Sequence, residues 1–170
     1  MTPLVSIIMG STSDLPVMEK ACQFLEEMQI PFEVNALSAH RTPAEVSNFA
    51  RTAHTRGIKV IIAGAGMAAA LPGVIAAESP LPVIGVPIKG SVLDGVDAVL
   101  SMLQMPPGIP VATVAVNGAQ NAAVLAMQIM ATGDPMMQQK VLQHKQGLKN
   151  KIVKANEELA KLEYQYCVKQ

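Results

Sequence analysis

Residues 40 and 41 are a histidine and an arginine, the pair in this sequence best suited to chemistry on an anionic substrate. A histidine side chain can take up and release a proton near neutral pH. An arginine can hold a phosphate or a carboxylate through two hydrogen bonds. We therefore expect His40 to exchange a proton during a reaction and Arg41 to bind the substrate. His54 and His144 lack such a setting and are expected at the surface.

The segment 10–14, which reads Gly-Ser-Thr-Ser-Asp, lies between a short apolar run and an amphipathic helical pattern. Backbone N–H groups and hydroxyls at the start of a helix can bind a phosphate, which makes Ser11 and Ser13 candidate ligands. Asp14 could accept hydrogen bonds from ribose hydroxyls. The simpler interpretation, N-capping of the helix, is expected to hold for either Ser13 or Asp14.

A third segment, 64–73, is rich in small residues and begins Gly-Ala-Gly. Gly64 and Gly66 would permit close approach of a ligand to the backbone. Residues 64–69 also fit the G-x-G-x-x-A form of the dinucleotide-binding fingerprint. The next predicted strand, however, ends without the acidic residue that would bind a ribose, so the fingerprint is weak support for a dinucleotide.

The three segments follow predicted strands, and alternating strand and helix patterns run through the first 133 residues. Short apolar runs predict strands at residues 4–9, 32–37, 58–63, 82–86 and 111–116. Helical periodicity, with a capping box at Thr42–Glu45, predicts helices at residues 14–29, 43–56, 67–77, 93–103 and 119–131. Such alternation favours a three-layer α/β/α fold with a flavodoxin-like parallel sheet of order 2-1-3-4-5. In that order the loops after strands 1, 2 and 3 meet at the switch point, where ligands bind.

The pattern changes after residue 133, and we therefore divide the chain into an α/β catalytic domain (1–133) and a C-terminal helical extension (134–170). The extension is rich in lysine. Its apolar residues recur at spacings of 4, 3, 4, 3 and 4, which is typical of a coiled-coil seam. The seam comprises Leu148, Ile152, Ala155, Leu159, Leu162 and Tyr166. The spacing leaves open whether this seam packs on its own domain or between subunits.

Composition limits the classes of function. Half of the 170 residues are hydrophobic and 15% are charged, which favours a surface partly covered by other subunits. Lys and Arg do not outnumber Asp and Glu overall, and no aromatic-plus-basic platform is present, so we expect no nucleic-acid partner. No apolar run is long enough to predict a membrane span, and we expect a cytoplasmic protein. Cys22 and Cys167 form no disulfide framework or metal pair, and Cys22 is expected in the core.

At the three loops the sequence resembles the catalytic subunit of phosphoribosylaminoimidazole carboxylase, a family known in bacteria as N5-carboxyaminoimidazole ribonucleotide mutase. The resemblance covers about residues 4–132. The matching stretches are MGSTSD (9–14), SAHRTP (38–43), IIAGAGMAAALPGVIAA (61–77), PVIGVP (82–87) and QMPPGIPVATVAV (104–116). The SAHRTP and GAG…LPG motifs are highly specific when they occur together in this order.

The resemblance implies a mutase of purine biosynthesis that shifts CO2 from the exocyclic nitrogen of N5-carboxyaminoimidazole ribonucleotide to the ring carbon. It implies no metal, no organic cofactor and a homo-octamer with active sites at subunit junctions. It also assigns roles to individual residues. His40 would be the acid/base, and the residues that bind substrate or line its pocket would be Ser11, Ser13, Asp14, Ser38, Arg41, Gly64 and Gly66.

Two residues depart from the family pattern. Mutases of this family typically read GAGGAAHLPG in the third loop, whereas this chain has Met67 and Ala70 in place of that Gly and His. A second imidazole is therefore missing. The nearest alternative function is an aminoimidazole ribonucleotide carboxylase that uses CO2 directly. A flavodoxin-like nucleotide-binding or redox module would need aromatic or acidic residues in the loops. A receiver-type signalling domain would need an Asp at the end of strand 3.

Overall fold

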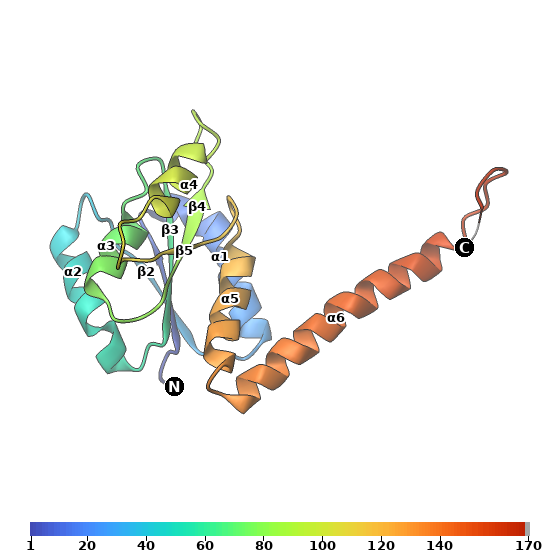
Figure 1. The fold of residues 1–170 in the computed structure, drawn as a ribbon, viewed down its shortest axis with the longest axis horizontal. Helices are drawn as coiled ribbons and strands as arrows, with labels where there is room; N and C mark the ends of the chain where they lie inside the picture. Colours follow the sequence, from blue (N-terminus) through green and yellow to red (C-terminus); the bar gives the residue numbers. More distant parts are fainter. Residues whose placement is uncertain (169–170) are drawn as a thin grey trace.

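The computed structural model describes residues 1–168 and contains one five-stranded parallel sheet, ordered β2-β1-β3-β4-β5 as predicted (Figure 1). The strands are β1 (Val5–Met9), β2 (Phe32–Ala36), β3 (Val60–Gly66), β4 (Val83–Ile88) and β5 (Ala112–Thr113). Every residue of β1 and β4 is buried, which explains their continuous apolar runs. The edge strands β2 and β5 are partly exposed.

Helices cover both faces of the sheet and complete the expected three layers. Helices α1 (Leu15–Glu27) and α5 (Ala119–Ala131) lie on one face. Helices α2 (Pro43–Thr52), α3 (Leu71–Glu78) and α4 (Val96–Leu103) lie on the other. Successive residues of β1 point to opposite faces, so Ile7 packs in the α1–α5 core and Ile8 in the α2–α3–α4 core.

The register of the sheet brings the three candidate loops together. Met9, the last residue of β1, pairs with Ala36 of β2 and with Gly64 of β3. The chain leaves these strands at the same edge of the sheet. The loops that carry the candidate residues therefore begin within one small region, as the strand order predicts.

Two helices begin later than predicted because left-handed residues precede them. Met67 has φ 54°, and the helix after β3 begins only at Leu71 instead of residue 67. Asp94 has φ 52° and Gly95 has φ 92°, so α4 begins at Val96 instead of residue 93. Neither conformation continues a right-handed helix.

The capping box predicted at residues 42–45 is wrong, because the Thr42 side chain does not cap α2. Its Oγ1 instead donates to the Ser38 carbonyl and accepts from the Ser38 N–H. The predicted helix 43–56 also divides into α2 and the 3-10 turn η2 (Ala53–Arg56). The fifth strand keeps only two of the six predicted residues, Ala112 and Thr113, which pair with Ile84 and Gly85 of β4.

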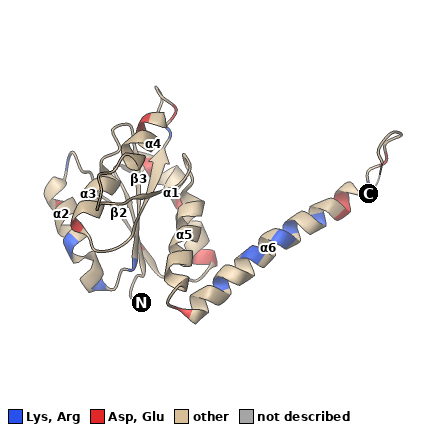
Figure 2. Ribbon diagram, viewed as in Figure 1, with Lys and Arg blue, Asp and Glu red and all other residues tan. Residues whose placement is uncertain are grey.

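Helix α6 (Pro135–Leu159) forms the C-terminal extension and touches the domain only near its start. Asp134 caps it, with the side chain accepting from the N–H groups of Met136 and Met137. Lys140 Nζ donates to the Met28 carbonyl at 2.7 Å. Beyond this contact region the helix projects away from the sheet (Figure 1), and lysines are spread along it (Figure 2).

The structure corrects the predicted seam at its C-terminal end and decides against one of the two packing alternatives that its spacing left open. Helix α6 ends at Leu159, so Leu162 and Tyr166 do not continue it. Leu148 is 49% exposed and Ile152 is 65% exposed, so the seam does not pack on its own domain. Cys22 is half-buried against the α1–α5 core, and Cys167 is exposed. No helix within residues 1–168 is both long and apolar enough to cross a membrane.

Candidate active site

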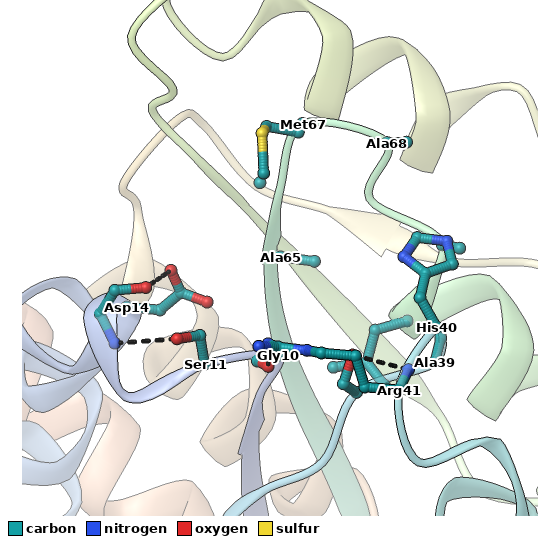
Figure 3. A pocket seen from close by; sticks show the side chains of 14 residues that line it. Gly10, Ser11, Asp14, Ala39, His40, Arg41, Ala65, Met67 and Ala68 are labelled. Atoms are coloured by element: carbon teal, nitrogen blue, oxygen red, sulfur yellow. Dashed lines mark hydrogen bonds between the residues drawn. The ribbon is translucent and has the colours of Figure 1, made fainter.

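A cleft of about 470 Å³ lies at the carboxyl edge of the sheet, where the loops after β1, β2 and β3 converge (Figure 3). A cleft of this size can hold a small nucleotide. Its lining consists of Gly10, Ser11, Ser13, Asp14, Ser38, Ala39, His40, Arg41, Ala65, Gly66, Met67, Ala68, Ala70 and Leu71.

Seven of the eight candidate site residues line this cleft, and Gly64 does not. Gly64 lies inside β3, where a Cβ would come within 2.5 Å of Met18 Sδ. The absence of a side chain there accommodates helix α1 rather than a ligand. Gly66 does line the cleft, and a Cβ on it would lie 3.2 Å from the Ile88 carbonyl oxygen. Glycine therefore also favours close packing of β3 against β4.

Arg41 links the first two loops. Its Nη2 donates to the Gly10 carbonyl at 2.7 Å, and its Nε donates to Ser38 Oγ at 3.3 Å. Its backbone N–H also donates to Ser38 Oγ, at 3.2 Å. A guanidinium has five N–H donors, and the two side-chain contacts above use only two of them, so most donors remain for an anionic ligand. Arg41 is exposed and held in a defined orientation at the cleft.

Asp14 is the acidic residue of the cleft. It occupies the N-cap position of α1, yet its side chain makes no capping bond, and Ser13 does not cap the helix either. Ser11 instead caps the short 3-10 turn Thr12–Asp14 that precedes α1, and its Oγ accepts a hydrogen bond from the Ser13 N–H at 3.3 Å. The expectation that Ser13 or Asp14 is the N-cap is therefore wrong in terms of side-chain bonding.

The electrostatics of Asp14 reflect its half-buried position. Burial raises the pKa of its carboxyl group, while hydrogen bonds from Ser13 and Ser11 and the charge of Arg41 oppose that rise. Ser13 Oγ donates to Asp14 Oδ1 at 3.4 Å. The carboxylate is thus available to accept hydrogen bonds from a polar ligand.

His40 is exposed on the second loop, and its imidazole lies beneath the loop that carries Met67 and Ala68 (Figure 3). The bonds between Thr42 and Ser38 close the turn on which His40 stands. Among the cleft-lining residues His40 is the only imidazole. Proton transfer near neutral pH would therefore fall to His40.

Sequence reasoning did not single out several residues of the third loop that line the cleft. Ala65, at the end of β3, and Ala68 and Leu71, just after it, have no polar side chain, so no residue type marks them as site residues. Their place directly after a central strand is the signal that could have indicated them. Within residues 1–168, no group of three His, Cys, Asp or Glu side chains could hold a metal ion.

Residues 4–151 match the family model described as AIR carboxylase. The chain belongs to the AIR carboxylase family. The match includes the whole sheet, all three cleft loops and the first part of α6. The resemblance drawn from the loop motifs is thereby confirmed.

Relatives within the AIR carboxylase family carry two names. The chain is 53% identical to an N5-carboxyaminoimidazole ribonucleotide mutase from Synechocystis sp., over 96% of this chain and 93% of the relative. It is 62% identical to a phosphoribosylaminoimidazole carboxylase from Ogataea methanolica, over 78% of this chain but only 24% of that longer protein. The fold also matches a crystal structure of a Treponema denticola PurE2 variant, with TM-score 0.85, 30% identity and coverage of 94% of this chain and 99% of the other.

Proposed function

We propose that this chain is an N5-carboxyaminoimidazole ribonucleotide mutase of purine biosynthesis. The observation that carries the proposal is the convergence of His40, Arg41, Ser11 and Asp14 on one cleft in a member of the AIR carboxylase family. The Synechocystis relative, which is similar over nearly the whole chain, bears the same name. The chain would then be an isomerase that moves a carboxylate group within one ribonucleotide.

In this proposal the polar loops bind the ribonucleotide. Arg41 and Ser11 contact its phosphate, because the guanidinium and the start of the first helix both favour an anion. Asp14 accepts hydrogen bonds from ribose hydroxyls. Ser13 and Ser38 complete the polar wall, and Gly66 leaves room beside it. Gly64 lies outside the cleft lining and supports the cleft from within β3.

The reaction needs one proton carrier and a site that retains CO2. Protonated His40 gives its proton to the exocyclic nitrogen as the N–C bond to the carboxylate breaks, which releases CO2 and leaves a neutral amine. The ring carbon then attacks CO2, and a C–C bond forms. His40 takes the proton from that carbon and returns to its protonated state. The balance requires no redox partner, no metal and no organic cofactor.

A carboxylase that uses CO2 directly is the second candidate, and the carboxylase name of the Ogataea methanolica relative favours it. The two reactions share the ring-carbon step and differ in the first substrate. An assay should therefore compare turnover of N5-carboxyaminoimidazole ribonucleotide with turnover of aminoimidazole ribonucleotide plus bicarbonate. Faster product formation from the first substrate supports the mutase. Product formation from the second alone would replace it with the carboxylase.

We also propose a cytoplasmic homo-oligomer, with an octamer as the assembly that the family resemblance implies. An exposed apolar stripe supports subunit contacts. It runs along the loop before α4 and α4 itself, at Leu93, Val96, Leu100 and Leu103, each more than half exposed. On α4 itself Val96, Leu100 and Leu103 lie 4 and 3 residues apart, which is the spacing of a helix face that packs against a partner.

A further inference from the structure

Met67 combines a rare backbone conformation with an exposed apolar side chain at the mouth of the cleft. Its φ of 54° lies in the left-handed region, which L-residues other than Asn and Asp seldom adopt. Its side chain is 70% exposed and lines the cleft. Glycine would adopt this backbone without strain. A methionine here is strained and also exposes apolar surface, which points to a use in the site.

The direction of the Met67 side chain indicates that use. In Figure 3 its thioether leaves the third loop and turns into the space between the Ser11–Asp14 loop and His40. On the other side it borders the loop after β4, since a Cβ on Gly90 would lie 3.9 Å from Met67 Cγ. The side chain therefore stands between that outer loop and the cleft.

The other residues of the same wall cannot cover a ligand. Ala65, Gly66, Ala68 and Ala70 have small side chains or none, and Leu71 is 3% exposed, held in the core. Met67 is thus the one long side chain of this wall that is exposed at the cleft. Methionine is flexible and gains contact when its apolar surface is covered.

We propose that Met67 is a positioning residue that closes over the bound ribonucleotide and retains the released CO2 beside the ring carbon. This inference rests on the proposed mutase function. CO2 is small and uncharged, so no charged group of the cleft can hold it firmly. Its capture at carbon competes with escape through the cleft mouth. An apolar cover reduces escape and keeps water out of the site.

The measurable consequence is the fraction of turnovers in which CO2 escapes from the site before it is captured by the ring carbon. With N5-carboxyaminoimidazole ribonucleotide as substrate, a covered site yields the carboxylated carbon product. A leaky site yields aminoimidazole ribonucleotide and free CO2. Partition should be measured in buffer purged of bicarbonate, with the background decay of the substrate without enzyme subtracted.

Three variants make the test specific. Met67→Gly removes the apolar cover and the backbone strain together, whereas Met67→Leu keeps an apolar cover. Met136→Gly is the matched control: Met136 is equally exposed, at 71%, but lies on α6 away from the cleft. We expect Met67→Gly to raise the escaping fraction about tenfold, the usual effect of losing burial of most of one such side chain. In Met67→Leu and Met136→Gly the escaping fraction should equal that of the unmodified protein.

The outcomes separate this inference from the function on which it rests. Equal partition in the unmodified protein and in Met67→Gly, with turnover intact, would overturn the role of Met67 alone. Thermal unfolding shows whether Met67→Gly is folded, and loss of strain should make it at least as stable as the parent. Absence of mutase turnover in the unmodified protein would overturn the proposed function and this inference together.

Discussion

His40 is the one imidazole among the residues that line the cleft, because residue 70 is an alanine. If His40 carries the proton between nitrogen and carbon, His40→Asn should lower turnover by at least roughly 100-fold, the usual effect of a positioned acid/base. The amide keeps a similar shape, so affinity for the ribonucleotide product should stay within about threefold. Steady-state kinetics and calorimetric titration measure both quantities. A variant with most of its activity would exclude His40 from the mechanism.

Arg41 should affect binding more than turnover. Arg41→Ala removes charge-assisted hydrogen bonds, and we expect affinity for the ribonucleotide product to fall by roughly 10- to 100-fold. Arg41→Lys keeps the charge and loses the planar donor geometry, so its affinity should be intermediate. Calorimetric titration with the product compares the three proteins. Unchanged affinity in Arg41→Ala would place the phosphate elsewhere in the cleft.

Residue types allowed most of the polar part of the site to be predicted, because serines, Asp14, His40 and Arg41 mark chemistry by their side chains. Small apolar residues do not, and Ala65 and Ala68 were missed for that reason, whereas Ala70 was noticed only through the family pattern. Gly64 lies outside the cleft lining, and its residue type alone does not distinguish ligand approach from close packing. Only the structure shows that Met18 fills the space beside it.

At the scale of elements, a network of hydrogen bonds that runs from the core to the surface joins β1 and β2 to the turn η2. Ser6 is fully buried, and its hydroxyl donates to Glu33 Oε1 at 2.9 Å. Arg56 donates to both carboxylate oxygens of Glu33, at 2.7 and 2.9 Å. Hydrogen bonds from Arg56, and then from Ser6, hold the pKa of Glu33 below its ordinary value although partial burial opposes this.

This network makes a prediction about the pH dependence of stability. A lowered pKa in the folded state means that the Glu33 carboxylate stabilises the fold above its unfolded-state pKa and loses that effect as pH falls through the folded-state value. Glu33→Gln should therefore reduce the free energy of unfolding by about 1 kcal/mol near neutral pH, a modest figure because water partly screens the pair. The difference should shrink below about pH 4.

Urea unfolding of both proteins across the acidic range measures this difference. Glu78→Gln is the matched control, because Glu78 also binds an arginine, Arg51, but contacts no fully buried hydroxyl. Its effect should be smaller. A Glu33→Gln difference that grows as pH falls would contradict the assigned direction of the Glu33 pKa.

The order of elements was predictable because apolar runs and helical periodicity alternate through the domain. Their ends were less predictable. Met67 and Asp94 delay two helices through left-handed backbone angles, which neither residue type favours strongly enough to predict. The apolar run at residues 111–116 predicted a longer strand than the two residues of β5, because apolar residues can also pack in coil.

At the scale of the whole molecule, α6 presents apolar residues with no covering surface in the single chain. Leu148, Ile152 and Leu159 are each about half exposed or more. We expect the purified protein to be a stable homo-oligomer in which this segment contacts a neighbour. Deletion of residues 148–170 should lower the thermal midpoint or shift the assembly to smaller species, because association and folding are linked by mass action.

Light scattering and thermal unfolding of the full-length and truncated proteins test this expectation. Deletion of residues 160–170 is the matched control, because it removes the segment after α6 and leaves the helix complete. Its effect should be smaller. A full-length monomer at micromolar concentration would contradict both the oligomer and the completion of the cleft by neighbouring subunits.

Gly147 lies where α6 leaves the domain, a few residues after His144 packs edge-on against Phe24. Glycine within a helix costs about 1 kcal/mol relative to alanine, and an isolated helix of about a dozen residues is marginal in water. We therefore expect the outer segment to need the cover of a neighbouring subunit to stay helical. Its helix–coil equilibrium should follow protein concentration, so dilution would reduce the circular dichroism signal at 222 nm, the usual helix wavelength, while the sheet persists.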